Sequence, residues 1–159
     1  MQSKEHILSI LSEIPDPEIP VINIKELGVL RDVIVNEHDI EVFITPTYSG
    51  CPAMKQIEND IVFSMKKNGI ENTKVKIVYH PAWTTDWITD EAKEKLRKYG
   101  IAPPEKTSID KDALLRKKKV CPHCGSENTE MVSQFGSTAC KALYKCLNCK
   151  EPFDYFKCH

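Results

Sequence analysis

Four cysteines near the end of the chain have the spacing of a metal site. They form two Cys-x-x-Cys pairs, Cys121 with Cys124 and Cys146 with Cys149. Four thiolates on two tight loops offer a tetrahedral set of sulfur ligands, which zinc fills without leaving an open position. The spacing therefore predicts a structural zinc site, and a rubredoxin-like iron site is the alternative because thiolate spacing does not separate the two metals.

A fifth cysteine, Cys51, lies where an expected strand ends and an expected helix begins. Apolar residues alternate from Ile40 to Ile44, and they then recur at three- and four-residue steps from Met54 to Met65. The unpaired N–H groups of a helix start favour an anion, so we expect a thiolate at Cys51 that binds metal or reacts. The alternative is a small hydrophobic side chain buried near the helix start, as free cysteine often is.

Composition narrows the class of protein. The 159 residues carry a net charge of −1 with a pI near 6.5, which argues against a strongly electrostatic nucleic-acid binder. No run approaches the roughly 18 apolar residues of a membrane span, and the start of the chain lacks the apolar core of a signal peptide. We expect a cytoplasmic protein. Because the cytoplasm is reducing, closely spaced cysteines there indicate metal binding more than disulfide bonds.

Hydrophobic periodicity predicts the order α-β-β-α-β-α for the first part of the chain. Ser3 can cap a first helix, and Asn36–Asp39 can turn between the first two strands. Gly69 and Gly100 end the later helices. The predicted fold class is α+β: a domain with a mixed sheet over residues 1–102, a linker over 103–119, and a β zinc ribbon over 120–159.

The expected topology gathers three loops at one edge of the sheet. The second and third strands should run parallel because a helix joins them, and the first should be antiparallel to the second. The loops that hold Cys51, the acidic pair Asp16 and Glu18, and the turn from His80 to Trp83 should then share a rim. Asp16, Glu18 and His80 are candidate supports for a metal; alternatively the two acids cap backbone N–H groups and His80 packs below Trp83.

Four further residues could ligate a second metal ion: His123, Cys140, Cys158 and His159. His123 lies inside the first Cys-x-x-Cys loop and is expected to point away from its metal. Cys140 is interpreted as a packing or partner contact, because free cysteine tends to be buried. Cys158 and His159 lie at a chain end, which frays unless it is docked. The basic run Arg116–Lys119 is interpreted as a solvated linker.

Two families resemble the two parts of this chain. The segments Asp16–Pro20, Thr47–Pro52 and Pro81–Trp83 resemble the small domain of the SufT and MIP-eighteen iron-sulfur assembly proteins. The segments Phe135–Cys146 and Glu151–Lys157 resemble the zinc-ribbon end of the PaaD family, also called PaaJ, which is a component of the phenylacetyl-CoA epoxidase system. Together the two resemblances cover nearly the whole chain in the order that the PaaD family has.

The resemblance implies an accessory protein of phenylacetate degradation that helps to mature a metal centre and does not itself catalyse. Its expected partners are the di-iron oxygenase and the reductase of a multicomponent monooxygenase. It also implies that Cys51 is a transient ligand of iron or an iron-sulfur cluster, with the remaining ligands from a second protomer, a partner or a small thiol. The resemblance places Thr47, Ser49 and Trp83 in the same motifs.

Two other hypotheses remain open from the residues alone. One is a zinc-ribbon adaptor that binds a protein or nucleic acid without metal transfer. The other is a thiol enzyme in which His80 serves as the base for Cys51.

Overall fold

The computed structural model describes residues 2–48, 50–104 and 118–156, and the chain divides into two compact units between Trp83 and Thr84. The sequence pattern predicted a first domain that extends to residue 102. The structure instead groups a helix and a short strand, residues 90–102, with the second unit, because that strand pairs with the last strand of the chain.

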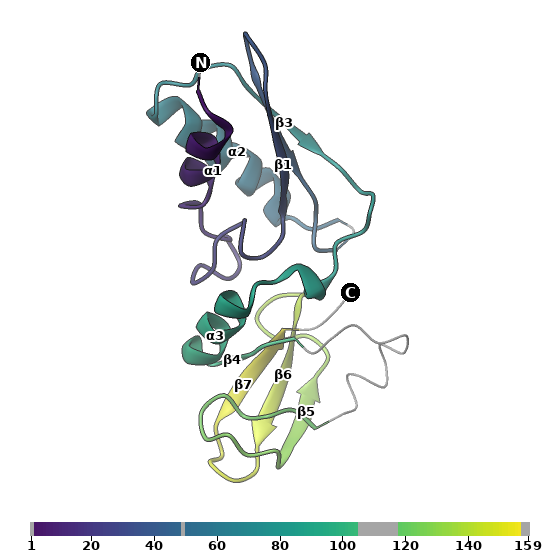
Figure 1. The fold of residues 1–159 in the computed structure, drawn as a ribbon. Coiled ribbons are helices and arrows are strands. Elements are labelled where there is room, and N and C mark those ends of the chain that lie inside the picture. The colour runs from purple at the N-terminus through teal and green to yellow at the C-terminus, as the bar shows by residue number, and fades with distance from the viewer. Residues whose placement is uncertain (1, 49, 105–117, 157–159) are drawn as a thin grey trace. The chain divides into compact units, whose positions relative to one another are not determined.

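The first unit has the predicted order of elements and a mixed three-stranded sheet. The sheet order is β1-β2-β3, with β1 antiparallel and β3 parallel to β2, as predicted. Figure 1 shows both helices on one side of this sheet. The elements are α1 (Lys4–Leu11), β1 (Leu30–Val35), β2 (Ile40–Ile44), α2 (Ala53–Lys67) and β3 (Thr73–Ile77).

Local sequence accounts for the ends of the two helices. The Ser3 side chain accepts a hydrogen bond of 3.2 Å from the backbone N–H of His6, which caps α1 as predicted. Helix α2 begins directly after Pro52 and is followed by Gly69 at a φ of 78°, the left-handed conformation that ends many helices. The buried side chains of α2 recur at helical spacing: Ala53, Met54, Ile57, Ile61 and Met65.

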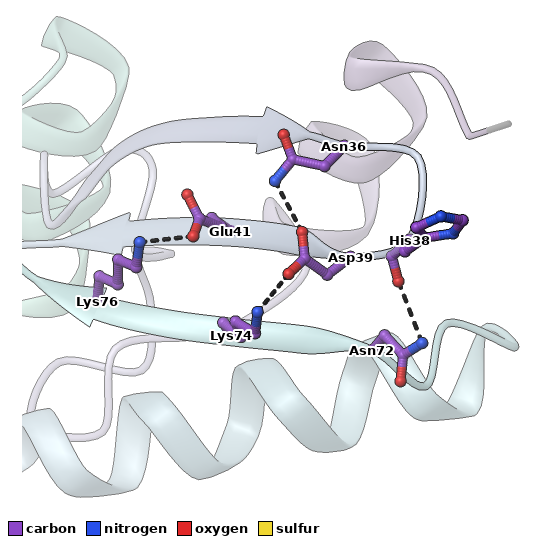
Figure 2. A network of polar contacts seen from close by, with 7 residues as sticks. All are labelled: Asn36, His38, Asp39, Glu41, Asn72, Lys74 and Lys76. Carbon is purple, nitrogen blue, oxygen red and sulfur yellow. Dashed lines mark hydrogen bonds and ion pairs between the residues drawn. The ribbon is translucent and has the colours of Figure 1, made fainter.

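The face of the sheet away from the helices carries ion pairs. Figure 2 shows Asp39 between Asn36 and Lys74, and Lys76 beside Glu41. Hydrogen bonds from Lys74 and Asn36 hold the pKa of Asp39 below its ordinary value. Exposed pairs of this kind contribute little to stability. They mark a solvent face, so the sheet buries its other face against α1 and α2.

The second unit is a four-stranded sheet with one helix. The order is β4-β7-β6-β5; β5 and β7 run antiparallel to β6, and β4 runs parallel to β7. The predicted β ribbon accounts for the last three strands, but no sequence pattern indicated β4, which is two residues long. The elements are the 3-10 turn η1 (Thr85–Trp87), α3 (Asp90–Tyr99), β4 (Ile101–Ala102), β5 (Thr129–Ser133), β6 (Lys141–Cys146) and β7 (Pro152–Phe156).

The core of this unit is aromatic. Tyr144 stacks on Phe153 at 5.8 Å between ring centroids and meets Tyr155 edge to face at 5.9 Å. Helix α3 is capped by the Thr89 side chain and ends at Gly100 with a φ of 93°. The α+β class with a C-terminal β ribbon is confirmed. Within the described ranges, no helix is long and apolar enough to cross a membrane.

Trp83 is a structural element of the first unit, and its ring is buried. Its Nε1–H donates a hydrogen bond of 2.9 Å to the carbonyl oxygen of Leu27. Replacing Trp83 with Phe keeps most of the ring but leaves that carbonyl without this donor. We therefore expect Trp83→Phe to destabilise the first unit by about 1–3 kcal/mol.

Urea unfolding followed by circular dichroism measures this loss. The matched control is Phe63→Ala on the outer face of α2, where 71% of the side chain is exposed and the effect should stay within about 0.5 kcal/mol. A Trp83→Phe midpoint equal to that of the native chain would contradict a structural role for the indole N–H.

Candidate functional site

The four predicted ligand cysteines come together in the second unit. Their sulfur atoms all lie within 4.8 Å of one another, with 3.8 Å between Cys121 and Cys149 and 3.6 Å between Cys124 and Cys146. Sulfurs about 2.3 Å from a tetrahedral zinc ion are separated by about 3.8 Å, whereas disulfide sulfurs lie about 2.05 Å apart. The separations therefore fit four ligands of one metal ion and do not fit disulfides.

Each Cys-x-x-Cys pair lies on a tight loop whose backbone turns back on itself. Gly125 N–H donates to the carbonyl of Cys121 at 2.9 Å, and Cys149 N–H points at the sulfur of Cys146 at 3.5 Å. That N–H lowers the pKa of Cys146 to about 6. A thiolate is the form that binds a metal, so the loop favours the ligating form of this side chain.

Polar side chains join the two ligand loops. Asn148 donates to the hydroxyl of Ser126 at 2.8 Å and accepts from the side-chain amide of Asn128 at 3.1 Å. Leu147 N–H donates to the carbonyl of Asn128 at 2.8 Å. No sequence motif marked these residues, because only the fold shows that they face one another. They orient the loops that carry the sulfurs.

Two other candidate ligands of the second unit, Cys140 and His123, are not part of the four-sulfur group. Cys140 is buried and its sulfur lies 2.9 Å from the hydroxyl of Thr138, so it packs as expected and is not part of the four-cysteine group that the described residues form. The His123 ring lies over Gly100, where a Cβ atom would meet it at 3.1 Å. Cys158 and His159 lie outside the described residues, as does Ser49.

Cys51 is half-buried just before α2, and its thiol is harder to ionise than an ordinary cysteine. Burial raises the pKa of Cys51, and the negative charge of Glu18 adds to that rise. The backbone N–H of Ala53 and hydrogen bonds with Tyr48 and Thr47 act in the opposite direction without cancelling it. The expectation of a thiolate is therefore wrong for the free protein, since burial outweighs the helix start. A metal ion that bound this sulfur would have to displace the proton.

The Cys51 side chain opens into a pocket between the start of α2 and the end of β3. The pocket has a volume of about 330 Å³. At its edge Lys55 and Glu58 form an ion pair at 3.3 Å. Tyr79, which no sequence motif marked as a site residue, follows β3 and is 63% exposed. The walls are formed by Pro46, Gly50, Pro52, Met54, Ile77 and Tyr79.

The remaining rim candidates have structural environments. Asp16 is buried, and its Oδ1 accepts from the N–H groups of Glu18 and Ile19, each at 2.9 Å. Asp16 therefore has the role of capping backbone N–H groups, which the sequence analysis offered as the alternative to supporting a metal. His80 is exposed and precedes a cis bond to Pro81, and among the described residues neither His80 nor Trp83 lines the Cys51 pocket.

The rim is therefore assembled only in part. The structure brings Glu18 and Thr47 to Cys51, but it does not bring His80 or Trp83 there among the residues that it describes. A thiol enzyme with His80 as the base loses its geometric support.

The residue after each Cys-x-x-Cys pair adopts the left-handed conformation: Gly125 at a φ of 76° and Lys150 at 67°. Non-glycine residues pay about 1–2 kcal/mol there. A Cβ on Gly125 would meet nothing within 4 Å, so Gly125→Ala tests the backbone cost alone. We expect it to weaken apparent zinc affinity by about tenfold in chelator competition, because metal binding and folding are coupled.

Lys150→Gly is the matched variant, and it should leave the zinc affinity unchanged or increase it. Glycine relieves the backbone strain of the left-handed conformation, which stabilises the loop. It also gives the unfolded chain more conformational entropy, which costs about 0.5–1 kcal/mol, so the two effects oppose each other. Equal losses in the two variants would show that the left-handed conformation is not what distinguishes the positions.

The acidity of Cys51 can be tested through Glu18. Removing the negative charge in Glu18→Gln should lower the pKa of Cys51, increase the thiolate fraction at neutral pH and speed alkylation of this sulfur. Mass spectrometry of the Cys51 peptide after iodoacetamide pulses measures the rate. Glu71→Gln is the control, because Glu71 follows the far end of α2, about 22 Å away along a 15-residue helix. A Glu18→Gln rate equal to the control would contradict the electrostatic coupling.

Comparisons with known proteins agree with the two-part architecture. Residues 4–79 match the family model described as iron-sulfur cluster assembly protein, and residues 105–157 match the one described as PaaD zinc beta ribbon domain. A solved structure from Bacillus anthracis, a domain of unknown function (DUF59), is similar with a TM-score of 0.55 and 27% identity, and the match covers 58% of this chain and 90% of that structure. A conserved hypothetical protein from Thermotoga maritima is similar with a TM-score of 0.51 and 28% identity, and the match covers 60% of this chain and 94% of that structure.

Two relatives extend the likeness in sequence. A protein of Porphyromonas gingivalis named Fe-S protein maturation auxiliary factor is 32% identical over 94 residues, 58% of this chain and 89% of its own length. A protein of Escherichia coli, named provisionally as the D component of 1,2-phenylacetyl-CoA epoxidase, is 50% identical over 152 residues, which is 96% of this chain and 91% of the relative. The chain therefore belongs to the PaaD family of epoxidase components, in which an iron-sulfur assembly domain precedes a PaaD zinc ribbon.

Proposed function

We propose that this protein is a non-catalytic accessory factor that helps to assemble or insert iron or an iron-sulfur cluster into the 1,2-phenylacetyl-CoA epoxidase system of the cytoplasm. The names of the two relatives support both parts of the proposal. The structural observation that carries it is the position of Cys51, half-buried before a helix and open to a pocket on the molecular surface. A thiol that a client protein can reach is suited to the transfer of iron or a cluster to that protein.

The cargo is received by exchange of a proton for a metal ion. Because burial keeps the Cys51 thiol protonated, an incoming ferrous ion or cluster iron must release that proton. The negative charge of Glu18 disfavours a free thiolate at Cys51, but it attracts a metal cation. The carboxylate therefore favours metal-bound Cys51 over the unbound thiolate.

One thiolate leaves most of the coordination sphere to other molecules. An iron-sulfur cluster takes four protein ligands in its common forms. Cys51 is the one cysteine of the first unit, so the others must come from a second protomer, from a small thiol or from the client. We propose that the client is the oxygenase or the reductase of the system.

The four-cysteine group serves a separate, structural purpose. We propose that Cys121, Cys124, Cys146 and Cys149 hold one zinc ion. Four sulfurs within 4.8 Å leave no ligand position for a client, and the match to a zinc ribbon model supports this metal over iron. The bound ion would stabilise the ligand loops and take no part in transfer.

Metal analysis of the anaerobically purified native chain and of Cys51→Ser tests the cargo site. We expect one zinc ion per chain in both proteins, and additional iron with a thiolate-to-iron absorption only in the native protein. Cys140→Ala is the matched control, since Cys140 is the other cysteine outside the four-sulfur group that the structure describes. Iron retained in Cys51→Ser would remove Cys51 from the proposal.

Co-expression tests the client. The oxygenase and the reductase are produced with the native chain, with Cys51→Ser or with neither, and their iron content and epoxidation are measured. Lower loading of one component without the native chain is the expected result. Equal loading in all three cases would reject the maturation role.

A further inference from the structure

The second unit contains a pocket that the proposed function does not use. Its volume is about 360 Å³, which lies within the range of small-molecule sites in proteins. Three segments that are far apart in the sequence form its walls: the end of α3 with β4 and the two residues after it, the residues around the first ligand cysteine, and β7. The pocket therefore exists only in the folded second unit.

Most of the pocket wall is apolar and presents rings. Ala102 of β4 pairs with Tyr155 of β7 in the parallel ladder that closes one side of the sheet (Figure 1). Proline and tyrosine rings offer flat faces, against which another flat apolar group packs well. The apolar residues of the wall are Ala102, Pro103, Pro104, Val120, Pro122 and Tyr155.

The other two residues of the wall are the cations Arg97 and Lys119, and no acid is among the described residues that line the pocket. The sequence pattern predicted a solvated linker at Lys119. That prediction is wrong, because Lys119 is only 2% exposed and its Nζ lies 4.4 Å from the centre of the Tyr155 ring. Two hydrogen bonds with Thr129, of 2.9 and 2.6 Å, fix the backbone of Lys119. A charge held away from water is screened less, so it attracts an anion more strongly.

Arg97 supplies a cation that a ligand can reach. Its side chain is 51% exposed, and it pairs with Glu94 one turn earlier on α3. An exposed pair of this kind contributes little to stability, so a carboxylate in the pocket can compete with Glu94 for the guanidinium. A guanidinium is well suited to this exchange because it can donate two parallel hydrogen bonds to one carboxylate.

We propose that this pocket binds a small organic anion that has one carboxylate on a flat apolar body. The body packs between the proline and tyrosine rings, and the carboxylate lies toward Arg97 and Lys119. A neutral molecule of the same shape makes no use of the two cations, and inorganic phosphate makes no use of the apolar wall. This inference concerns the second unit and does not depend on the proposed function.

Benzoate is the probe, with benzamide as its neutral counterpart of nearly equal shape. Each is titrated into the full zinc-loaded chain, and the chemical shifts of the backbone amides are followed by NMR. Benzoate should shift the amides of Ala102, Val120 and Tyr155 with a dissociation constant of the order of 1 mM, as expected for a ligand of this size. Benzamide and inorganic phosphate should each bind at least about tenfold more weakly, because each lacks one of the two attractions.

Variants at exposed residues locate the site without disturbing the core. Val120→Glu places a negative charge in the wall and should weaken benzoate binding at least about tenfold. Val132→Glu is the matched control, since Val132 is similarly exposed (57%, against 52% for Val120) and is not part of the wall. Arg97→Gln should weaken binding about three- to tenfold, whereas Lys98→Gln, the same loss of charge at the next residue of α3, should not.

Three results would overturn the proposal. One is the absence of a saturable shift at these amides in the native chain. Another is equal binding of benzoate and benzamide, or of benzoate and phosphate, which would show that the pocket does not select a carboxylate on an apolar body. The third is equal weakening by Val120→Glu and Val132→Glu, which would place the benzoate elsewhere.

Discussion

Main-chain pairing of β2 with β3 is the interaction on which the candidate site depends. The two strands run parallel, from Ile40 opposite Thr73 to Ile44 opposite Ile77, so the chain must cross over between their ends. Helix α2 makes that crossing while it buries one face on the sheet. As a result, the start of α2 and the end of β3 lie at the same edge, and the Cys51 pocket is the space between them. Without the parallel register, Cys51 would have no pocket.

The two kinds of cysteine in this chain show how surroundings decide the chemistry of one side chain. The four sulfurs of the ribbon lie within 4.8 Å of one another. Cys51 is alone and half-buried, and burial with the charge of Glu18 raises its pKa. The first arrangement can supply every ligand position of a tetrahedral metal ion from one chain. Cys51 supplies a single sulfur, so in the proposed role another molecule would complete the coordination.

The ribbon is larger than its cysteine spacing indicates. A four-cysteine module of this length buries little apolar surface and depends on its metal for folding. Here β4 adds to the sheet beside β7, and α3 contacts β4. The aromatic core around Tyr144 and Tyr155 is therefore extended by residues that precede the ribbon in the sequence. This explains why the second unit begins near Thr84, well before the first ligand cysteine.

The sequence by itself determined the longer helices and strands of the first unit, the α+β class and the four-sulfur centre, because each depends on local spacing: alternation for β2, three- and four-residue steps for α2, and two residues between paired cysteines. Only the tertiary structure decided which rim residues meet Cys51. Asp16 turned inward to bind N–H groups, Trp83 was buried against Leu27, and Tyr79, which no motif marked, lined the pocket. Side-chain direction in loops rich in proline follows from competition among distant hydrogen-bond partners, which no local pattern records. The ionisation of Cys51 was decided in the same way, since burial, a property of the whole fold, outweighed the helix start that the sequence made visible.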